Sequence, residues 1–324
     1  RKSPGEECFT ANGKEGKTVP VNMSPKLTNP YNGLLNINKP AGMTSHDVVN
    51  RVRRILGQKR VGHAGTLDPA ATGILLVCAG QATRLVEYLV PGIKTYQGTI
   101  RLGQATDTYD SEGEFTSETE TGHLDREMVE AAMVSFTGDI EQVPPAYSAI
   151  KRDGVPSYKL ARKGKDVNLP ARRVRIESFE LIEWNHPELT FRIVCQSGTY
   201  VRSIAHDLGV ALEVGGYLKS LCRTGSGSWR VEDALDLAAL EQAAEDGRLE
   251  SVIRPFSDVL ADIPGVTITE KEIAQLGYGQ GLPLEIEGGP EIICARAETG
   301  RLVAILVPDG TNRWRPKKVF PETG

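Results

Sequence analysis

The alternation of apolar and polar residues along the chain predicts a series of short strands and helices. Residues 33–37 form an apolar run that is typical of a strand, and residues 46–56 carry apolar side chains at helical spacing. Thr44 and Ser45 precede this helix as potential caps, and Gly57 follows it as a C-cap. Further strands are expected at 96–102 and 191–195, and further helices at 126–136, 202–212 and 235–244.

These elements follow one another without the regular cadence of a doubly wound parallel sheet, which favours the α+β fold class. After residue 265 the pattern changes to strand-like runs at 290–297 and 301–308, separated by glycine-rich turns. The first thirty residues are polar and offer little apolar surface for burial. We therefore expect three parts, namely a flexible tail at 1–31, a large domain at 32–260 and a small β-rich domain at 261–324.

Composition narrows the class of protein. The 324 residues are 40% hydrophobic and 25% charged, which is typical of a globular protein with a substantial core. The longest apolar run, residues 74–79, is far shorter than the ~18 residues that a membrane span needs, and no secretory signal is recognisable. Five scattered cysteines without a C-x-x-C pair argue against a disulfide scaffold or a zinc ribbon. We expect a reduced, cytoplasmic protein that does not bind a membrane.

Charge is distributed unevenly along the chain. The net charge of −4 by itself argues against nucleic-acid binding, but residues 151–175 contain nine basic and two acidic side chains. Residues 47–60 contain five basic and one acidic side chain, whereas residues 107–130 contain nine acidic side chains and one arginine. A polarised surface of this kind attracts an anionic partner even when the total charge is small. The alternative is that each charged run is only a solvated face.

The segment at 61–75 is the most unusual part of the chain. Glycines bracket His63 and Asp68, which predicts a loop with close backbone approaches rather than a regular element. Asp68 precedes Pro69, so its backbone is biased away from the helical region. A rigid loop that presents one carboxylate is a reasonable active-site design. The alternative is that Asp68 and Pro69 form a simple turn and that His63 is a core residue.

The same segment, GHAGTLDPAATG at 62–73, resembles the signature loop of the TruB family of tRNA pseudouridine synthases. Four other stretches resemble motifs of this family and occur in the family's order. They are NKPAGMTS at 38–45, KTY with LGQATDTYD between 94 and 110, QVPPAYSAIK at 142–151 and GTYVRS at 198–203. Two positions depart from the family pattern, since Tyr217 replaces a common histidine and Cys222 replaces an arginine. These departures bear on tRNA affinity more than on activity.

The resemblance implies an enzyme that isomerises the uridine at position 55, in the T-loop of tRNA, to pseudouridine. The uridine would be flipped out of its stack before it reacts. The implied fold has a pseudouridine-synthase core of mixed or antiparallel sheet with flanking helices, followed by a PUA-like β-rich domain. No metal and no other cofactor is implied. The expected partner is the T-arm and elbow of tRNA, and the protein is expected to be a monomer without an obligate protein partner.

Three catalytic residues follow from the resemblance. Asp68 corresponds to the essential aspartate, Tyr96 would stack on the uracil, and Arg202 would pair with Asp68. These residue types suit the reaction, because a guanidinium offsets the cost of burying an ionised carboxylate and a tyrosine offers both a flat face and a hydroxyl. Without the resemblance, Tyr96 would be read as a packing residue and Arg202 as a surface residue.

The resemblance also implies a substrate-binding set. His63 would contact the displaced part of the T-loop, Asp110 would lie near the arginine, and Leu221 would form an apolar wall of the pocket. Lys39 and Lys151, each within a matching stretch, complete the set. The basic run at 151–175 would supply phosphate contacts.

Other functions remain open from the sequence. A related enzyme could modify RNA within a guide-directed ribonucleoprotein, and a tRNA chaperone could use the same fold without catalysis. A hydrolase based on Ser45 and His46 is disfavoured, because no partner motif such as G-x-S-x-G is present. Nucleotide binding is also disfavoured, since GYGQG at 277–281 does not fit the G-x-G-x-x-G pattern.

Overall fold

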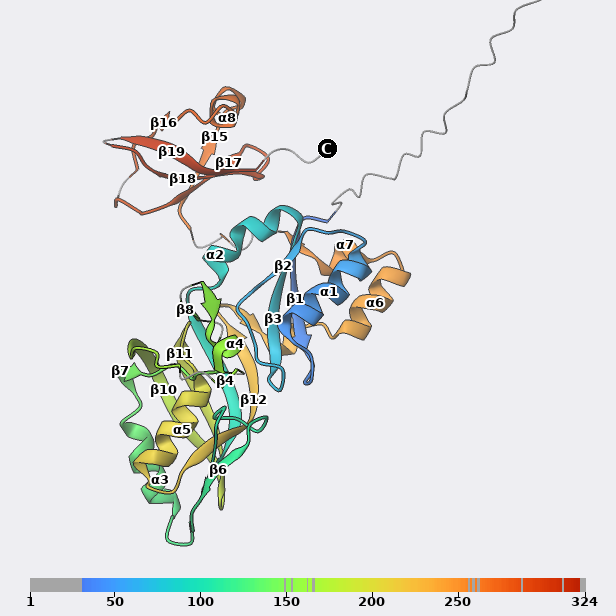
Figure 1. Cartoon of the computed structure of the whole chain (residues 1–324). Helices are drawn as coiled ribbons and strands as arrows, with labels where there is room; N and C mark the ends of the chain where they lie inside the picture. Colours follow the sequence, from blue (N-terminus) through green and yellow to red (C-terminus); the bar gives the residue numbers. More distant parts are fainter. Residues whose placement is uncertain are drawn as a thin grey trace, which may run out of the picture.

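The computed structural model describes residues 31–148, 150–152, 154–161, 163–164, 167–255, 257, 260, 263–286, 288–310 and 312–320. These residues form two large β-sheets with helices packed against them, and two further two-stranded sheets, β5 with β6 and β8 with β9 (Figure 1). Most of the predicted tail at 1–31 lies outside the described residues. Tyr31 is described, and its backbone N–H and C=O both bond to the Gln58 side chain at 3.1 Å. Within this part of the chain, no helix is long and apolar enough to cross a membrane.

The larger sheet carries most of the fold. Every strand pair described in it is antiparallel except β3 with β12, which is parallel. In spatial order its strands are β14 (Arg254–Pro255), β1 (Gly33–Lys39), β3 (Thr72–Ala79), β12 (Gly216–Ser226), β4 (Ile93–Leu102), β11 (Glu188–Gln196), β10 (Arg172–Asn185) and β7 (Gly138–Gln142), with β2 (Val61–Ala64) beside β3 and β13 (Trp229–Arg230) beside β12.

Two groups of helices cover one face of this sheet (Figure 1). One group packs on β1 and β3 and consists of α1 (Ser45–Leu56), α6 (Leu237–Glu245) and α7 (Leu249–Val252). The other group packs on β4, β10 and β11 and consists of α3 (Arg126–Val134) and α5 (Val201–Ala211). The α+β class, with a mixed sheet and flanking helices, is therefore confirmed. The remaining short elements of this part are η1 (Gly80–Leu85), α2 (Val86–Leu89), β5 (Gln104–Thr106), β6 (Phe115–Glu118), β8 (Lys151–Arg152), β9 (Val155–Pro156), α4 (Ser157–Ala161) and η2 (Val231–Asp233).

Helix α1 forms for the local reasons that its sequence indicates. Thr44 caps its first turn in a capping box with Asp47, and Gly57 ends it with φ +60°. Its apolar stripe is buried against β3, and each such side chain contributes about 1.5–3 kcal/mol. The Ser45 hydroxyl accepts from Leu67 N at 2.9 Å and donates to Leu67 O at 3.1 Å. The start of the helix therefore anchors the loop that carries Asp68.

The prediction of one irregular loop at 61–75 is wrong at both ends. Residues 61–64 form β2 and residues 72–75 begin β3, so only 65–71 is a loop. Gly73 misleads because it lies inside a strand with φ +95°, where a Cβ would lie 2.3 Å from Arg223 O. Its role is the close approach of β12 to β3. Strand β12 itself went unpredicted, because two register shifts interrupt its alternation.

The C-terminal residues form a second, five-stranded sheet with one helix (Figure 1). Leu85 of η1 packs with Leu302 and Phe320 in a shared apolar cluster, and Arg84 stacks over the Phe320 ring at 4.9 Å. The C-terminal unit therefore rests on η1. Its elements are β15 (Gly265–Ile268), α8 (Glu270–Gly277), β16 (Leu282–Pro283), β17 (Ile293–Ala297), β18 (Leu302–Pro308) and β19 (Arg313–Val319), with sheet order β15-β17-β18-β19-β16.

Candidate functional site

Asp68 and Arg202 form the centre of the site. Arg202 is the second residue of α5 and is only 6% exposed. Its Nε lies 2.9 Å from Asp68 Oδ2, and its Nη2 donates to Asp68 Oδ1 at 3.2 Å. A two-point contact of this kind fixes the carboxylate in both position and orientation. The tertiary structure thus joins two predicted catalytic residues that are 134 positions apart.

A second carboxylate lies on the other side of the same guanidinium. Asp110 Oδ2 is 3.4 Å from Arg202 Nη1, and Asp110 Oδ1 accepts from the Thr108 hydroxyl at 2.6 Å and from Glu112 N at 3.1 Å. The Asp110 side chain is 11% exposed, whereas that of Asp68 is 41% exposed. Asp68 is therefore the carboxylate that a substrate can reach. Asp110 holds the arginine, and it does not line an open surface.

Arg202 also donates to two backbone carbonyls. Its Nη1 donates to Thr108 O at 3.1 Å, and its Nη2 donates to Tyr147 O at 3.0 Å. The surroundings act on the pKa of Asp68 in opposite directions. Burial raises this pKa and the negative charge of Asp110 adds to the rise, whereas the charge of Arg202 opposes it. The pKa of Asp68 is raised overall, and Arg202 is the main group that limits this rise.

Tyr96 faces the same side of the sheet as the Asp68 loop. It pairs with Arg223 of β12, which in turn pairs with Gly73 of β3, so all three positions share one face. Burial raises the pKa of the Tyr96 hydroxyl, and the positive charge of Arg223 opposes this rise. Leu221 lies opposite Gly98 on the same face and packs against the adjoining core.

Arg223 is a site residue that sequence reasoning missed. It is 3% exposed, its Nε donates to Ile74 O at 2.8 Å, and its Nη2 donates to Gly65 O at 3.2 Å. An arginine in an unpredicted strand gives no local sign that it is buried. The one available sign was its place beside Leu221 and Cys222, in a stretch already compared with a family motif.

Two predicted substrate-binding residues, His63 and Lys39, behave differently. His63 of β2 is half-buried, and its Nδ1 has no hydrogen-bond partner among the described residues. Burial and the charge of Arg223 lower the pKa of its ring, which favours a neutral imidazole at pH 7. Lys39, in contrast, is fully buried, and burial lowers its pKa to about 8.

The structure contradicts a direct contact between Lys39 and a substrate. Its Nζ donates to three carbonyls, those of Pro40 at 2.9 Å, Met43 at 2.7 Å and Pro69 at 3.0 Å. An ammonium group has three donors, so all of them are in use. Lys39 therefore stabilises the backbone of the loop just after Asp68, through its bond to Pro69 O.

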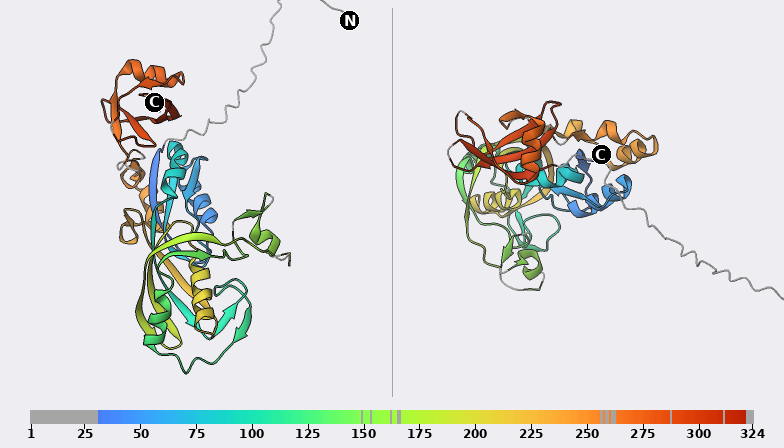
Figure 2. Two further views of the ribbon diagram at one scale, coloured as in Figure 1. Left: turned by 90° about the vertical axis from the view of Figure 1, so that its left-hand side faces the viewer. Right: turned by 90° about the horizontal axis from the view of Figure 1, so that it is seen from above.

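The basic run at 151–175 does not form one continuous stripe. Its first part belongs to an arm, containing α4, that projects from the body of the molecule (Figure 2), where Lys159 and Lys163 are exposed. The side chain of Lys151 lies outside the described residues. Arg173 and Arg175 lie on β10 and pair with Asp139 at 3.4 and 3.7 Å. These two arginines alternate with core-facing residues, so they point to the opposite face of the sheet from the site.

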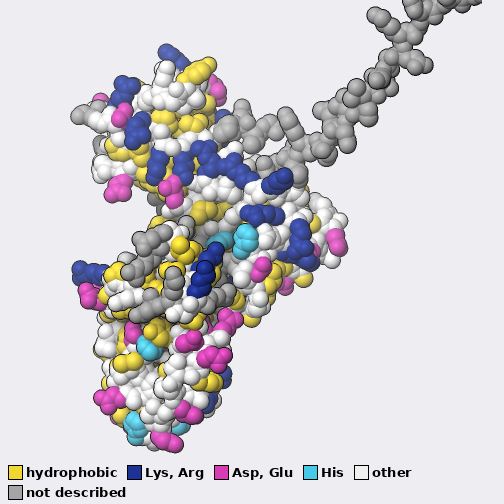
Figure 3. Space-filling model, in the orientation of Figure 1, with side chains coloured by type: hydrophobic (Ala, Val, Ile, Leu, Met, Phe, Trp, Pro, Cys, Tyr) yellow, Lys and Arg dark blue, Asp and Glu magenta, His cyan; other side chains and the backbone are white. Residues whose placement is uncertain are grey.

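Basic side chains also gather elsewhere on the surface. Figure 3 shows Lys and Arg along the edge of the C-terminal unit that borders the larger domain. The exposed basic residues of β19 alternate along this strand and include Arg313, Arg315 and Lys317. Such a row is a suitable surface for a phosphate backbone.

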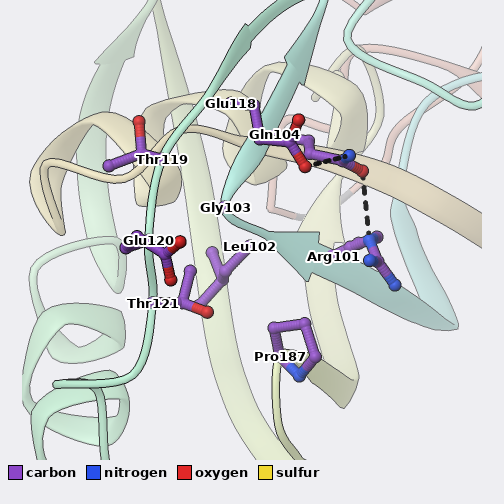
Figure 4. A pocket seen from close by; sticks show the side chains of 9 residues that line it. All are labelled: Arg101, Leu102, Gly103, Gln104, Glu118, Thr119, Glu120, Thr121 and Pro187. Carbon is purple, nitrogen blue, oxygen red and sulfur yellow. Dashed lines mark hydrogen bonds between the residues drawn. The ribbon is translucent and has the colours of Figure 1, made fainter.

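The cavities of the molecule do not by themselves identify the site. One hollow of about 430 Å³ lies at the far end of β4 (Figure 4), and no predicted site residue lines it. A second hollow of about 460 Å³ includes Leu221, and residues such as Gln97 and Thr99 also line it. These two residues alternate with Tyr96 along β4, so their side chains lie on the opposite face of the sheet from Tyr96. Among the described residues, no group of three or more His, Cys, Asp or Glu is arranged to hold a metal ion.

Comparison with known proteins agrees with this geometry. Residues 53–201 match the model of the TruB family pseudouridylate synthase N-terminal domain, and residues 202–261 match that of the tRNA pseudouridylate synthase B C-terminal domain. The protein named tRNA pseudouridine synthase B of Dehalococcoides mccartyi (strain ATCC BAA-2266 / KCTC 15142 / 195) is 45% identical over 289 residues, covering 89% of this chain and 96% of that protein. Its namesake from Trichormus variabilis (strain ATCC 29413 / PCC 7937) is 42% identical, covering 84% and 93%.

A solved structure shares the fold as well. A chain in the structure of an H/ACA RNP bound to a substrate RNA containing 2′-deoxyuridine is 26% identical and superposes with a TM-score of 0.68, covering 90% of this chain and 85% of that one. The family models span the Asp68 loop, β4 and α5, which together build the site. The chain belongs to the TruB family.

Proposed function

We propose that the protein converts uridine 55 in the T-loop of tRNA to pseudouridine, with Asp68 as the catalytic carboxylate. The observation that carries this proposal is the half-exposed Asp68 carboxylate, held through both oxygens by a buried arginine on the face that also bears Tyr96. The names of the relatives from Dehalococcoides mccartyi and Trichormus variabilis support tRNA as the substrate.

The site contains the groups that this reaction requires. The bond between C1′ and N1 breaks, a bond between C1′ and C5 forms, and the net result is that C5 loses a proton and N1 gains one. No electrons enter or leave, so a nucleophilic or basic carboxylate and a group that moves a proton are sufficient. Asp68 supplies the carboxylate, and Tyr96 supplies a face for the unstacked uracil and a hydroxyl for the proton.

The remaining parts of the proposal concern partners. His63 lies beside the Asp68 loop and would contact the displaced nucleotides, and Leu221 would wall the uracil pocket. The C-terminal unit at 261–324 is proposed to be PUA-like and to share in binding the tRNA elbow. We propose a monomer that acts in the cytoplasm without an obligate protein partner. The H/ACA RNP relationship keeps a guide-directed activity as the alternative.

The proposed function is tested by tritium release from tRNA labelled with [5-³H]uridine, since the proton lost from C5 carries the label. We expect about one equivalent of tritium per tRNA, all from position 55, with no guide RNA or protein added. A tRNA with uridine 55 replaced by cytidine serves as the control and should release none from the T-loop. Binding without release would instead favour a tRNA chaperone or a different RNA substrate.

Tyr96→Phe should lower the catalytic rate more than the affinity for tRNA. The phenyl ring keeps the stacking face but lacks the hydroxyl, and loss of a positioned acid–base group costs about 10²-fold or more in rate. Single-turnover tritium release gives the rate, and filter binding gives the Kd. An unchanged rate would show that the hydroxyl is idle.

The projecting arm should contribute to tRNA binding through charge. Replacing Lys159 and Lys163 by Gln should flatten the plot of log Kd against log salt by about one to two units, because each phosphate contact contributes about 0.7–0.9. Arg173→Gln with Arg175→Gln is the matched control, since it removes the same charge from side chains that already pair with Asp139. Equal slopes for both double variants would place the RNA elsewhere.

A further inference from the structure

Arg223 lies between three parts of the site and bonds to two of them through its guanidinium. Its Nε reaches Ile74 O at the start of β3, and its Nη2 reaches Gly65 O at the start of the Asp68 loop. Tyr96 of the neighbouring strand β4 is the register partner of Arg223 and lies beside it on the same face of the sheet. A planar guanidinium presents its donors in a rigid fork, whereas the donors of an ammonium group rotate on a flexible stem.

Two glycines adjoin Arg223, and at Gly73 the close approach leaves no room for a side chain. A Cβ at Gly73 would lie 2.3 Å from Arg223 O, and a Cβ at Gly65 would lie 3.4 Å from Arg223 Nη1. These glycines stand on either side of the segment that carries Asp68. The loop therefore abuts the same arginine at both of its ends, once through the backbone and once through the side chain.

The positive charges of Arg223 and Arg202 have different kinds of neighbouring groups. Arg202 contacts two carboxylates, whereas the hydrogen bonds described for Arg223 go to two carbonyl oxygens. Arginine stays protonated even when buried. Burial raises the pKa of Tyr96, and the positive charge of Arg223 opposes that rise, so Arg223 acts on the Tyr96 hydroxyl through charge as well as through packing.

We propose that Arg223 is a positioning residue for the reaction, which holds the Gly65 end of the Asp68 loop against the Tyr96 side chain in one geometry and affects the rate through Tyr96. This inference rests on the proposed function. It assigns a task to an arginine at the centre of the sheet that has no described contact with Asp68 itself. Arg223 and Tyr96 are directly opposed on adjacent strands, so the two residues should behave as a coupled pair.

A double-mutant cycle of Arg223→Gln and Tyr96→Phe tests the coupling. In the otherwise natural chain, Arg223→Gln should lower the single-turnover rate by about 10-fold to 10²-fold, with the tRNA Kd changed by less than about threefold. In the Tyr96→Phe background the same substitution should cost less than about threefold. Arg53→Gln is the matched control, because Arg53 donates to a strand carbonyl, Val61 O at 2.8 Å, away from Tyr96.

Thermal unfolding shows whether each variant folds. Arg223→Lys serves as a second variant in case Arg223→Gln does not fold. It keeps the charge and should restore only part of the rate, and its own cycle with Tyr96→Phe must show the same coupling. Equal fold losses in both backgrounds would overturn the proposal and leave Arg223 as a support of the fold alone. A natural chain that releases no tritium would instead overturn the proposed function, and this inference with it.

Discussion

Asp68→Asn is expected to abolish tritium release while leaving tRNA binding nearly unchanged. The amide has almost the shape of the carboxylate, and its oxygen can still accept from Arg202, so the loop should keep its geometry. It lacks the charge and lone pairs that a nucleophile or base needs. Loss of a group that forms or accepts bonds in the reaction typically costs on the order of 10⁴-fold or more.

The comparison with Asp139→Asn makes the result specific. That variant removes the same charge from a β7 side chain that pairs with arginines on the other face of the sheet, and its rate should equal that of the natural chain. The Kd of Asp68→Asn, measured by filter binding, should stay within about threefold, because electrostatic binding is set by the basic surface and not by this carboxylate. Turnover retained by Asp68→Asn would sink the assignment of Asp68 as the catalytic residue.

Arg202→Gln is expected to damage both activity and stability. It leaves Asp110 buried without its counter-charge, and breaking a buried ion pair in this way costs about 3 kcal/mol or more, with a smaller share from the half-exposed Asp68. The rate should fall by about 10²-fold to 10³-fold, since an oriented charge beside the reacting group is lost. Thermal unfolding and single-turnover release measure the two effects separately.

The pH dependence gives this prediction a definite sign. Burial already raises the pKa of Asp68, and Arg202 is the group that opposes the rise. Removing the guanidinium must therefore raise this pKa further, so the acid limb of the pH–rate profile should move to higher pH. A limb that stays in place would show that Arg202 does not control the ionisation of Asp68.

A second substitution separates the structural effect of Arg202 from the catalytic one. Asp110→Asn in the Arg202→Gln background removes the stranded buried charge, and it should recover part of the unfolding free energy without recovering the rate. Arg173→Gln is the surface control, because its side chain is 78% exposed and an exposed ion pair contributes about 0–1 kcal/mol.

The amino-acid sequence by itself determined the features that depend on near neighbours. Helix α1 follows from the spacing of its apolar residues and from Thr44 and Gly57 at its ends, and the structure confirms both caps. The strands at 96–102 and 191–195 and the helix at 202–212 are also confirmed, within a few residues. Capping, periodicity and turn chemistry act over a few positions, so they can be recognised without knowing the fold.

Only the tertiary structure decided which charged residues meet. The family resemblance implies the pairing of Arg202 with Asp68 and the nearby Asp110, but no local feature of α5 indicates it. That Lys39 donates all its hydrogen bonds to carbonyls has no sign in the sequence at all. Arg223 reaches Tyr96 only because β12 lies between β3 and β4, an order created by long connections. Strand order and register are set by packing across the whole sheet, and a shift of one residue would turn each of these side chains to the other face.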